Sequence, residues 1–475
     1  MASAFFALAC VVVFVCITIV SLLTGFALVL SLKSRLQRRR RKAFSVGFFH
    51  PYCMGGGGGE RVLWAALNSL GSRRSDVEYI IYTGDDADKC CKFREHVIHR
   101  FKISIPADIT VRFVHLRMRT LLEAHHYPML TMIGQSIGSM IVGVEALWKF
   151  SPDVYIDTTG HAFTFPLFYF LGGCSVGAYV HYPTISTDML SRVKERKTSY
   201  NNVSFVSRNP FLSALKIYYY HIFAWLYGLA GRCCDIPLVN STWTYNHIIQ
   251  LWKGSQPVIV YPPCNVEEFL RISLQREDSK NAERILIVSI GQFRPEKDHA
   301  LQLHSLAALL FILPKEVRDR IQMDFIGGCR NADDYKRVET LEQLAEKLLV
   351  KDFVKFHLNA SFPELLEICR NGTIGIHTMW NEHFGIGVVE GMAAGLITVA
   401  HDSGGPKADI VVDFQGKNTG FLASDAESYA KCMKQIILLN ENDRDGIRKR
   451  AKESVLRFTD EVFDAKFYNN VAHLL

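Results

Sequence analysis

Two glutamates, Glu382 and Glu390, are the side chains in this sequence best spaced to do chemistry together. We expect an apolar strand over 373–377, a tight turn over 383–387 and a helix from Val388 onward. Glu390 then lies about one turn inside that helix. Because the first turn of a helix has unpaired N–H groups and the positive end of the helix dipole, it suits a diphosphate. The pattern predicts a nucleotide-sugar site in which Glu382 holds sugar hydroxyls and Glu390 holds ribose hydroxyls; the alternative is an ordinary helix that carries a glutamate.

Two cations follow another predicted strand, over 285–290, which ends in Gly291. Arg294 and Lys297 lie in the loop at the carboxyl end of this strand. Two positive charges in that place suit a diphosphate leaving group, whose negative charge grows as the glycosidic bond breaks. The alternative is a solvated loop with ordinary charges.

Five consecutive glycines, 55–59, join a short apolar strand over 44–49 to a helix over 60–70. A glycine loop between a strand and a helix lets backbone N–H groups approach a phosphate or a sugar closely. The loop lacks the Lys-Ser/Thr pair of a P-loop. Its place at the first strand-to-helix turn favours a binding role over a flexible surface loop.

His181 directly follows an apolar segment over 163–180, which we interpret as a buried helix and then a strand. A histidine at the carboxyl end of a strand in an α/β sheet lies where such folds bind ligands. A core or capping histidine is the alternative. Metal binding is not expected, because the D-x-D at 86–88 lies in a solvated acidic loop and the twelve cysteines include no C-x2-C pair.

The elements that must position these residues alternate between strands and helices, which predicts parallel, doubly wound sheets. A fresh α/β unit opens at Ile285, so we expect two Rossmann-like domains that face a cleft. We expect residues 44–266 to form an acceptor domain, 267–284 a linker, 285–442 a nucleotide-sugar-binding domain and 443–475 a helical segment.

The N-terminus reads as a membrane anchor. Residues 2–32 are apolar and carry no charge before Lys33, and this length can cross a bilayer as a helix. A cleaved signal peptide would need a basic start and a small-residue cleavage site, and neither is found. The flank over 33–43 holds seven basic residues and no acid, so the positive-inside rule puts the rest of the chain in the cytosol.

The body of the chain balances its charge, since that flank supplies the whole net charge of +7. Nucleic-acid binding is therefore disfavoured. Residues 209–231 are apolar nearly all round and rich in tyrosine, which fits either a core helix or an interfacial helix on a membrane. The basic loop over 192–197 favours membrane contact. Sequons at Asn202, Asn240, Asn359 and Asn371 provide a test of topology.

Two longer motifs carry a family resemblance. G-Q-F-R-P-E-K-D-H (291–299) with N-E-H-F-G-I-G-V-V-E (381–390) resembles the retaining nucleotide-sugar glycosyltransferases of family 4, which have the two-domain GT-B fold. Within that family the chain is most similar to the α-1,2-mannosyltransferases of the dolichol pathway. H-P-Y-C-M-G-G-G-G-G-E-R-V-L-W, D-T-T-G-H-A-F-T-F-P and H-Y-P-T-I-S-T-D-M-L carry this closer likeness.

The resemblance implies GDP-mannose as donor and dolichol-linked Man3GlcNAc2, then Man4GlcNAc2, as acceptors. It implies retention at the anomeric carbon, no metal or other cofactor, and a single-pass protein with its catalytic domain on the cytosolic face of the endoplasmic reticulum membrane. Association with other cytosolic-face mannosyltransferases is a further implication. The alternatives are a related transferase that moves GlcNAc from UDP-GlcNAc to an inositol lipid, or an inactive transferase-like scaffold.

The resemblance also implies roles for individual residues. Arg294 and Lys297 would clamp the diphosphate, Glu382 would contact the mannose and Glu390 the ribose. His181 would touch the donor sugar from the first domain. The donor site implied in this way further includes Gly57, Gly58 and Gly59, which would close over the cleft, and Phe384, Gly385 and Ile386. His383 stands where the wider family often has a proline.

Overall fold

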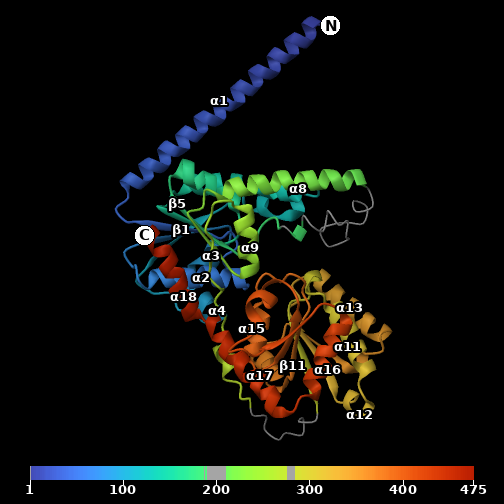
Figure 1. The fold of residues 1–475 in the computed structure, drawn as a ribbon. Coiled ribbons are helices and arrows are strands. Elements are labelled where there is room, and N and C mark those ends of the chain that lie inside the picture. Colours follow the sequence, from blue (N-terminus) through green and yellow to red (C-terminus); the bar gives the residue numbers. More distant parts are fainter. Residues whose placement is uncertain (1, 187, 190–209, 275–283) are drawn as a thin grey trace.

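The computed structural model describes residues 2–186, 188–189, 210–274 and 284–475. Its strands form two parallel sheets, and Figure 1 shows them in two domains, one above the other. A long N-terminal helix, α1 (Ala2–Arg40), leads away from the first domain. The predicted class, an α/β chain with two doubly wound domains and an apolar N-terminal helix, is confirmed.

The first sheet has the order β3-β2-β1-β4-β5-β6-β7. Its strands are β1 (Ser45–Phe49), β2 (Glu78–Thr83), β3 (Thr110–His115), β4 (Val154–Asp157), β5 (Ser175–Val180), β6 (Ile236–Val239) and β7 (Val258–Ile259). The direction of winding reverses between β1 and β4, which pair in parallel. Phe48, Tyr79 and Ile156 are buried because helices cover both faces of such a sheet.

The second sheet has the order β10-β9-β8-β11-β12-β13 and reverses its winding between β8 and β11. Its strands are β8 (Ile285–Ile290), β9 (Ile321–Gly327), β10 (Val354–Leu358), β11 (Ile374–His377), β12 (Ile397–His401) and β13 (Gly420–Ala423). In open α/β sheets ligands bind beyond the carboxyl ends of the strands at such a reversal. Glu382 follows β11 and Lys297 follows β8, so both lie at that reversal.

Helices cover both sheets. In the first domain these are α2 (Gly58–Gly71), α3 (Ala87–Cys91), α4 (Phe93–Phe101), α5 (Thr131–Lys149), α8 (Pro210–Gly231) and α9 (Thr242–Leu251), with the shorter η1 (Arg119–Leu122), η2 (Ala124–His126), η3 (Ala162–Thr164) and η4 (Leu167–Gly172). In the second they are α10 (Glu267–Leu270), η5 (Pro295–Lys297), α11 (His299–Ile312), α12 (Lys315–Arg318), α13 (Ala332–Lys347), η6 (Lys351–Phe353), α14 (Phe362–Asn371), α15 (Ile386–Ala393), η7 (Pro406–Ile410), α16 (Ala426–Leu438) and α17 (Glu441–Ser454).

The chain ends by returning to the first domain. After α17 and η8 (Val455–Phe458), α18 (Asp460–Val471) packs against α2, and η9 (Ala472–Leu474) follows. Phe463 and Phe467 of α18 are buried in the core of the first domain, and Figure 1 shows this helix beside α2. The segment 443–475 is thus helical but divided between the domains. Of the predicted linker, residues 275–283 lie outside the described part of the chain.

The N-terminal helix is fixed to the first domain at its lower end. Within its segment Ile17–Arg40, an 18-residue stretch has a mean hydropathy of 1.8, and the helix is long and apolar enough to cross a membrane. Phe26 stacks on Trp148 of α5 with ring centroids 6.2 Å apart, and Lys33 Nζ lies 3.6 Å from the centroid of the same ring. Arg38 donates a hydrogen bond to the carbonyl of Gly173, directly after η4. Arg41 Nη2 also lies 3.3 Å from Asp153 Oδ2, so at least three of the flanking cations contact the folded domain.

Candidate active site

The loop that carries Glu382 is held by the loop after β12. The Asn381 N–H donates to Ser403 Oγ at 2.8 Å, and the Gly405 N–H donates to the Glu382 carbonyl at 2.7 Å. Gly404 has φ +62°, and a Cβ at this position would lie 2.3 Å from the Glu382 carbonyl oxygen. Only glycine therefore permits this close approach of two loops, and the approach sets where Glu382 lies.

The Glu382 carboxylate lies between the side chains of Lys297 and His377. Lys297 Nζ donates to Glu382 Oε2, and His377 Nε2 lies 3.2 Å from the same oxygen. Burial alone would raise the pKa of the Glu382 carboxyl, but the charge of Lys297 and the hydrogen bond with His377 outweigh burial and hold that pKa well below its usual range. Glu382 is therefore ionised. The structure brings Lys297 and Glu382 together, and it adds His377, the last residue of β11, to which sequence reasoning gave no role.

Arg294 lies on the same loop as Lys297 but has different neighbours. Its Nη1 is 3.7 Å from Glu296 Oε1, and its side chain lines a cavity of about 430 Å³ between α11 and α13. Asp298, Lys336 and Arg337 line the same cavity. The Lys297 N–H donates to the Arg294 carbonyl at 3.2 Å, but no described contact links the Arg294 side chain to the side chain of Lys297 or Glu382.

Glu390 lies on α15, which begins at Ile386, two residues earlier than predicted, because Gly385 with φ +116° ends the preceding turn. Burial raises the pKa of the Glu390 carboxyl to about 7, although the charge of Arg61 opposes the shift. No contact between Glu390 and Glu382 is found among the described residues. Phe384 packs against Tyr261 and Phe458, so only the backbone of this residue is left to face a ligand.

The glycine loop reaches the second domain. Gly57 is the N-cap of α2, and its N–H donates to Glu60 Oε2 at 2.9 Å. A Cβ on Gly58 would lie 2.8 Å from Ile386 Cδ1 of α15, and one on Gly59 would lie 3.8 Å from His181 Nε2. The structure therefore brings the predicted glycines, His181 and Ile386 into one place between the domains.

His181 is neutral, and one of its ring nitrogens is buried without a hydrogen-bond partner among the described residues. Burial lowers its pKa to about 4, opposed by a hydrogen bond with the Thr158 backbone. Its Nε2 has no hydrogen-bond partner among the described residues, so Nδ1 must make the bond to Thr158. With Nδ1 as the donor, Nε2 is a free acceptor beside Gly59.

Next to His181, aromatic side chains of the first domain contact His383 of the second domain. The rings of Tyr182 and His383 lie 4.3 Å apart, and those of Trp243 and His383 lie 5.2 Å apart. Asn381 Nδ2 donates to Asp188 Oδ2 at 2.5 Å. His383 thus occupies a slot between aromatic rings of the first domain. Sequence reasoning missed Tyr182 and Trp243, although both closely follow the ends of strands.

A second contact between the domains lies at Asp409. Its carboxylate accepts hydrogen bonds from the Thr242 N–H at 2.9 Å, the Thr242 hydroxyl at 2.5 Å and the Tyr261 hydroxyl at 3.0 Å. Arg457 donates to the Asp409 carbonyl at 2.6 Å. These contacts tie the start of α9 to η7 and help to set the relative position of the domains.

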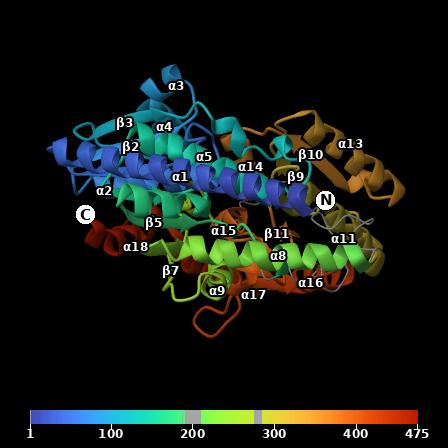
Figure 2. The ribbon, with the colours of Figure 1, turned by 90° about the horizontal axis from the view of Figure 1, so that it is seen from above.

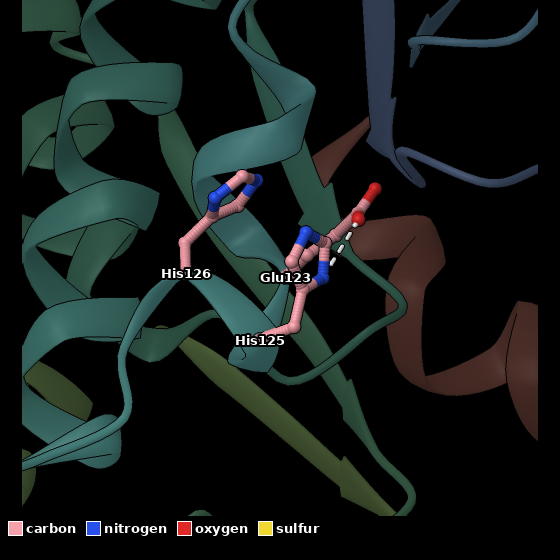
Figure 3. A group of neighbouring side chains, drawn as sticks. All are labelled: Glu123, His125 and His126. Atoms are coloured by element: carbon pink, nitrogen blue, oxygen red, sulfur yellow. Dashed lines mark ion pairs between the residues drawn. The ribbon is translucent and has the colours of Figure 1, made fainter.

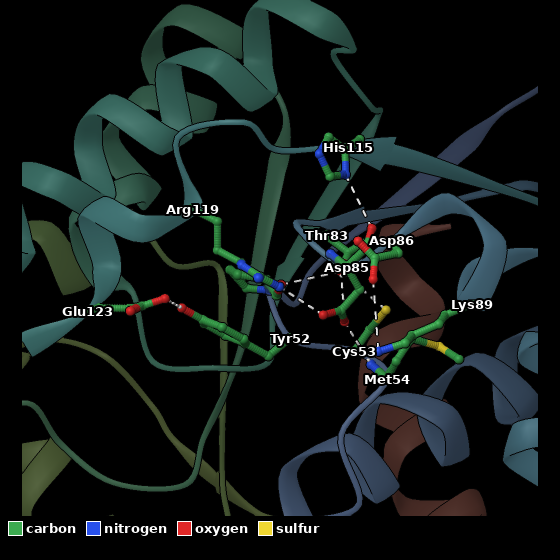
Figure 4. Close-up of polar contacts among 11 residues, drawn as sticks. Tyr52, Cys53, Met54, Thr83, Asp85, Asp86, Lys89, His115, Arg119 and Glu123 are labelled. Atoms are coloured by element: carbon green, nitrogen blue, oxygen red, sulfur yellow. Dashed lines mark hydrogen bonds and ion pairs between the residues drawn. The ribbon is translucent and has the colours of Figure 1, made fainter.

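The start of the glycine loop is held by Asp85, as Figure 4 shows. Its carboxylate accepts from the Met54 N–H at 2.9 Å and from Arg119 Nη1 at 2.8 Å. Asp86, the first acid of the D-x-D, is exposed and occupies the N-cap position of α3 without a side-chain capping hydrogen bond, with Lys89 Nζ 3.9 Å away. This loop therefore positions residues 54–59.

A group of three potential metal ligands lies elsewhere in the first domain. Glu123, His125 and His126 offer ligand atoms within 4.8 Å of one another, as drawn in Figure 3. Glu123 Oε1 accepts from the Tyr52 hydroxyl at 2.9 Å, and Glu123 Oε2 lies 3.3 Å from His125 Nδ1. Both histidines are exposed, and no described contact links this group to Glu382.

Two family descriptions match this chain. Residues 43–252 match "ALG11 mannosyltransferase N-terminus", and residues 271–454 match "Glycosyl transferases group 1". The chain is 49% identical over 463 residues to the human GDP-Man:Man(3)GlcNAc(2)-PP-Dol alpha-1,2-mannosyltransferase, which covers 97% of this chain and 93% of the relative. The protein of the same name from Dictyostelium discoideum is 43% identical, over 91% of this chain and 85% of the relative.

Solved structures show the fold. The Anabaena HepE protein, in complex with UDP and glucose, matches with a TM-score of 0.57 at 16% identity, over 90% of this chain and 99% of that one. The trehalose 6-phosphate synthase of Burkholderia multivorans matches with a TM-score of 0.64 at 13% identity, over 91% and 99%. Taken with the identity to its relatives, this fold shows that the chain belongs to the GDP-Man:Man(3)GlcNAc(2)-PP-Dol α-1,2-mannosyltransferase family of GT-B glycosyltransferases.

Proposed function

We propose that this chain transfers mannose from GDP-mannose to dolichyl-diphosphate-linked Man3GlcNAc2 and then to the Man4GlcNAc2 product, with retention of configuration. The observation that carries the proposal is the contact of Lys297, Glu382 and His377 at the winding reversal of the second sheet. The names of relatives that are 43–49% identical over most of the chain support the same substrates.

In this proposal Lys297 and Glu382 pair with each other in the unliganded protein and with the donor when it binds. When the donor binds, Lys297 pairs with its diphosphate, and the Glu382 carboxylate becomes free to accept hydrogen bonds from mannose hydroxyls. The bond between the anomeric carbon and the phosphate oxygen then breaks, and the positive charges of Lys297 and Arg294 stabilise the departing GDP. A hydroxyl of the acceptor mannose bonds to the anomeric carbon from the same face, and its proton passes to the departing phosphate.

His181 and Glu390 complete the donor site in this proposal. The free Nε2 of His181 accepts a hydrogen bond from a hydroxyl of the donor sugar. Glu390 accepts hydrogen bonds from the ribose hydroxyls, and the backbone of Gly57–Gly59 covers the donor from the first domain. We propose that no metal takes part, because the two cations supply the charge that a metal would supply.

The N-terminal helix fits a membrane anchor. We propose that it crosses the endoplasmic reticulum membrane once, with both domains in the cytosol, since the basic flank over 33–42 follows the span directly. The dolichol-linked acceptor would then diffuse in the same bilayer, which raises its concentration at the active site.

The test is a transfer assay with the full-length chain in phosphatidylcholine vesicles. GDP-mannose and a lipid-linked Man3GlcNAc2 acceptor are supplied, and the released glycans are sized by mass spectrometry. We expect two added hexoses, both removed by an α-1,2-specific mannosidase. Transfer from UDP-GlcNAc to an inositol lipid, with none from GDP-mannose, would contradict the proposal.

A further inference from the structure

An apolar groove of about 880 Å³ lies on the first domain between α5, η4 and α8. Its walls include Ile137 and Met140 from α5, Tyr169 and Phe170 from η4, and Phe223 and Leu226 from α8. Ser136, which also lines it, already donates its hydroxyl to the Met132 carbonyl at 2.7 Å. A ligand for this groove must therefore be largely apolar, because the walls offer it few free hydrogen-bonding groups.

The groove opens on an exposed apolar surface. On α8 the exposed apolar side chains include Leu215, Tyr218, Ile222, Trp225 and Leu229, spaced three or four residues apart, so that these five share one face of the helix. Phe170 of η4 is 65% exposed and extends this face beside the groove. A contiguous exposed apolar surface marks a contact with protein or membrane.

The position of α1 indicates that this exposed apolar surface meets a membrane and not another protein. The helix that can span a membrane is docked on α5 and η4, through Phe26 and Lys33 on Trp148 and through Arg38 on Gly173. These two elements also form two walls of the groove. Figures 1 and 2 show α1 and α8 on the same side of the first domain, the side away from the second domain. The groove is therefore continuous with the surface from which the membrane span leaves.

The inner wall of the groove lies close to the loops that carry His181. Phe163 lines the groove, and the centroid of its ring lies 5.5 Å from that of Phe223 and 6.4 Å from that of Tyr227. Tyr227 in turn makes a side-chain hydrogen bond with Thr184, three residues after His181. A molecule in the groove thus shares its supporting elements with the active site.

We propose that this groove binds the isoprenoid chain of the lipid-linked acceptor and so selects acceptors by their lipid. The inference rests on the proposed function for the identity of the acceptor. An isoprenoid chain is apolar along its whole length, as the walls require, and the cation Arg232 beside the groove complements the diphosphate at the head of such a lipid. A groove with three walls holds one chain in place, which an open surface on bulk lipid does not.

The test compares two acceptors that share the glycan and the diphosphate but carry either a long isoprenoid or a chain of only about four isoprene units. Leu226 lines the groove, so Leu226→Trp should fill it. Ile222 lies one turn earlier on α8 and is exposed to nearly the same degree (40%, against 37% for Leu226), but it does not line the groove, so Ile222→Trp is the matched control. We expect wild type and Ile222→Trp to prefer the long chain in kcat/KM about tenfold. Leu226→Trp should lose the preference while its KM for GDP-mannose is unchanged.

A variant of the opposite wall, Met140→Trp, should behave like Leu226→Trp. An unchanged preference in both groove variants would overturn the proposal. A loss that appears equally in Ile222→Trp, together with weaker binding to phosphatidylcholine vesicles, would assign the whole face to bulk lipid instead.

Photolabelling separates this inference from the proposed function. A photoreactive isoprenyl diphosphate that carries no glycan should label α5 and α8 of the full-length wild type, and Leu226→Trp should abolish this labelling. If wild type transferred no mannose to either acceptor but was labelled in the groove, the transferase proposal would fail and the lipid site would stand. If it transferred mannose but showed no labelling in the groove, the lipid site would fail.

Discussion

Lys297 and Glu382 stabilise each other in the unliganded protein, so that changing one alone has two separable effects. Lys297→Met should abolish transfer because the diphosphate loses its cation. It should also lower the free energy of unfolding by about 3 kcal/mol, because a mostly buried carboxylate is left with His377 alone.

The double variant Lys297→Met/Glu382→Gln serves as the control. It removes the unpaired charge, so stability measured by denaturant unfolding should return while activity stays absent. A Lys297→Met variant with full activity would contradict the assigned role. A double variant no more stable than Lys297→Met would show that the ion pair is not the reason for the loss.

Glu390 should make the unliganded protein less stable as the pH rises. Its pKa is about 7 in the folded chain against an ordinary value of 4.5. Between pH 4.5 and 7 the folded state therefore binds more protons than the unfolded state, so the free energy of unfolding falls as the pH rises. Above neutral pH this loss of stability reaches at most about 3 kcal/mol. Glu390→Gln should consequently raise Tm by several degrees near pH 8 and by little near pH 5. The exposed Glu339→Gln serves as control, and a Tm gain independent of pH would contradict the cause given.

Sequence reasoning found the residues at strand ends but not their partners. Glu382, Lys297 and His181 were predicted because each follows an apolar strand, which is a local pattern. His377 and Trp243 were missed, since their roles depend on contacts made only when separate loops meet. The unpartnered nitrogen of His181 likewise depends on the Thr158 backbone, to which no local pattern points.

At the scale of elements, the loop after β12 sets the position of the loop after β11. Gly404→Ala should reduce kcat/KM about a hundredfold, because its Cβ would push the Glu382 carbonyl, and with it the carboxylate, by a large fraction of an ångström. Gly416→Ala is the matched control: Gly416 has φ +74° and no atom within 4 Å of a Cβ. It should lose about 1 kcal/mol of stability through backbone strain and keep its activity. Equal activity in the two variants would contradict the argument.

Strands were easier to predict than the remaining elements. The segments 44–49 and 285–290 are buried apolar runs, and the structure places strands there within one residue. The start of α15 was placed two residues too late, since the left-handed conformation of Gly385 decides it. Whether the apolar helix over 209–231 lies in a core or on a surface could not be decided from composition. In the structure α8 does both, with Phe223 and Tyr227 buried and Tyr218 and Trp225 exposed.

At the scale of the whole molecule, two further connections act with the aromatic contacts of His383 to hold the domains in register. One is the contact of Asp409 with the start of α9, and the other is α18, which crosses back to α2. Arg61 of α2 joins this return: it donates to Asp460 Oδ1 at 2.8 Å and to the Phe101 carbonyl at 2.7 Å. Sequence showed a helical tail but not its destination, because the apolar faces of α17 and α18 would suit either core. The glycine loop and α15 face each other because these connections bring them together.

Because α1 is docked against the first domain, the orientation of α1 in a membrane determines on which side of that membrane both domains lie. If both domains are cytosolic, the exposed sequons at Asn359 and Asn371 stay unmodified when the full chain is produced in eukaryotic cells. Treatment with a glycan-removing amidase should therefore leave its electrophoretic mobility unchanged.

The matched control inverts the topology and leaves the domains unaltered. A cleavable signal sequence replacing residues 1–24 sends the same domains into the lumen, and there both asparagines should be glycosylated, since both are accessible in the fold. Glycosylated full-length chain would place the domains in the lumen and contradict the cytosolic assignment. A directed form that is itself unmodified would show that the fold hides these sequons, and protease protection of the first domain in sealed microsomes would then decide the orientation.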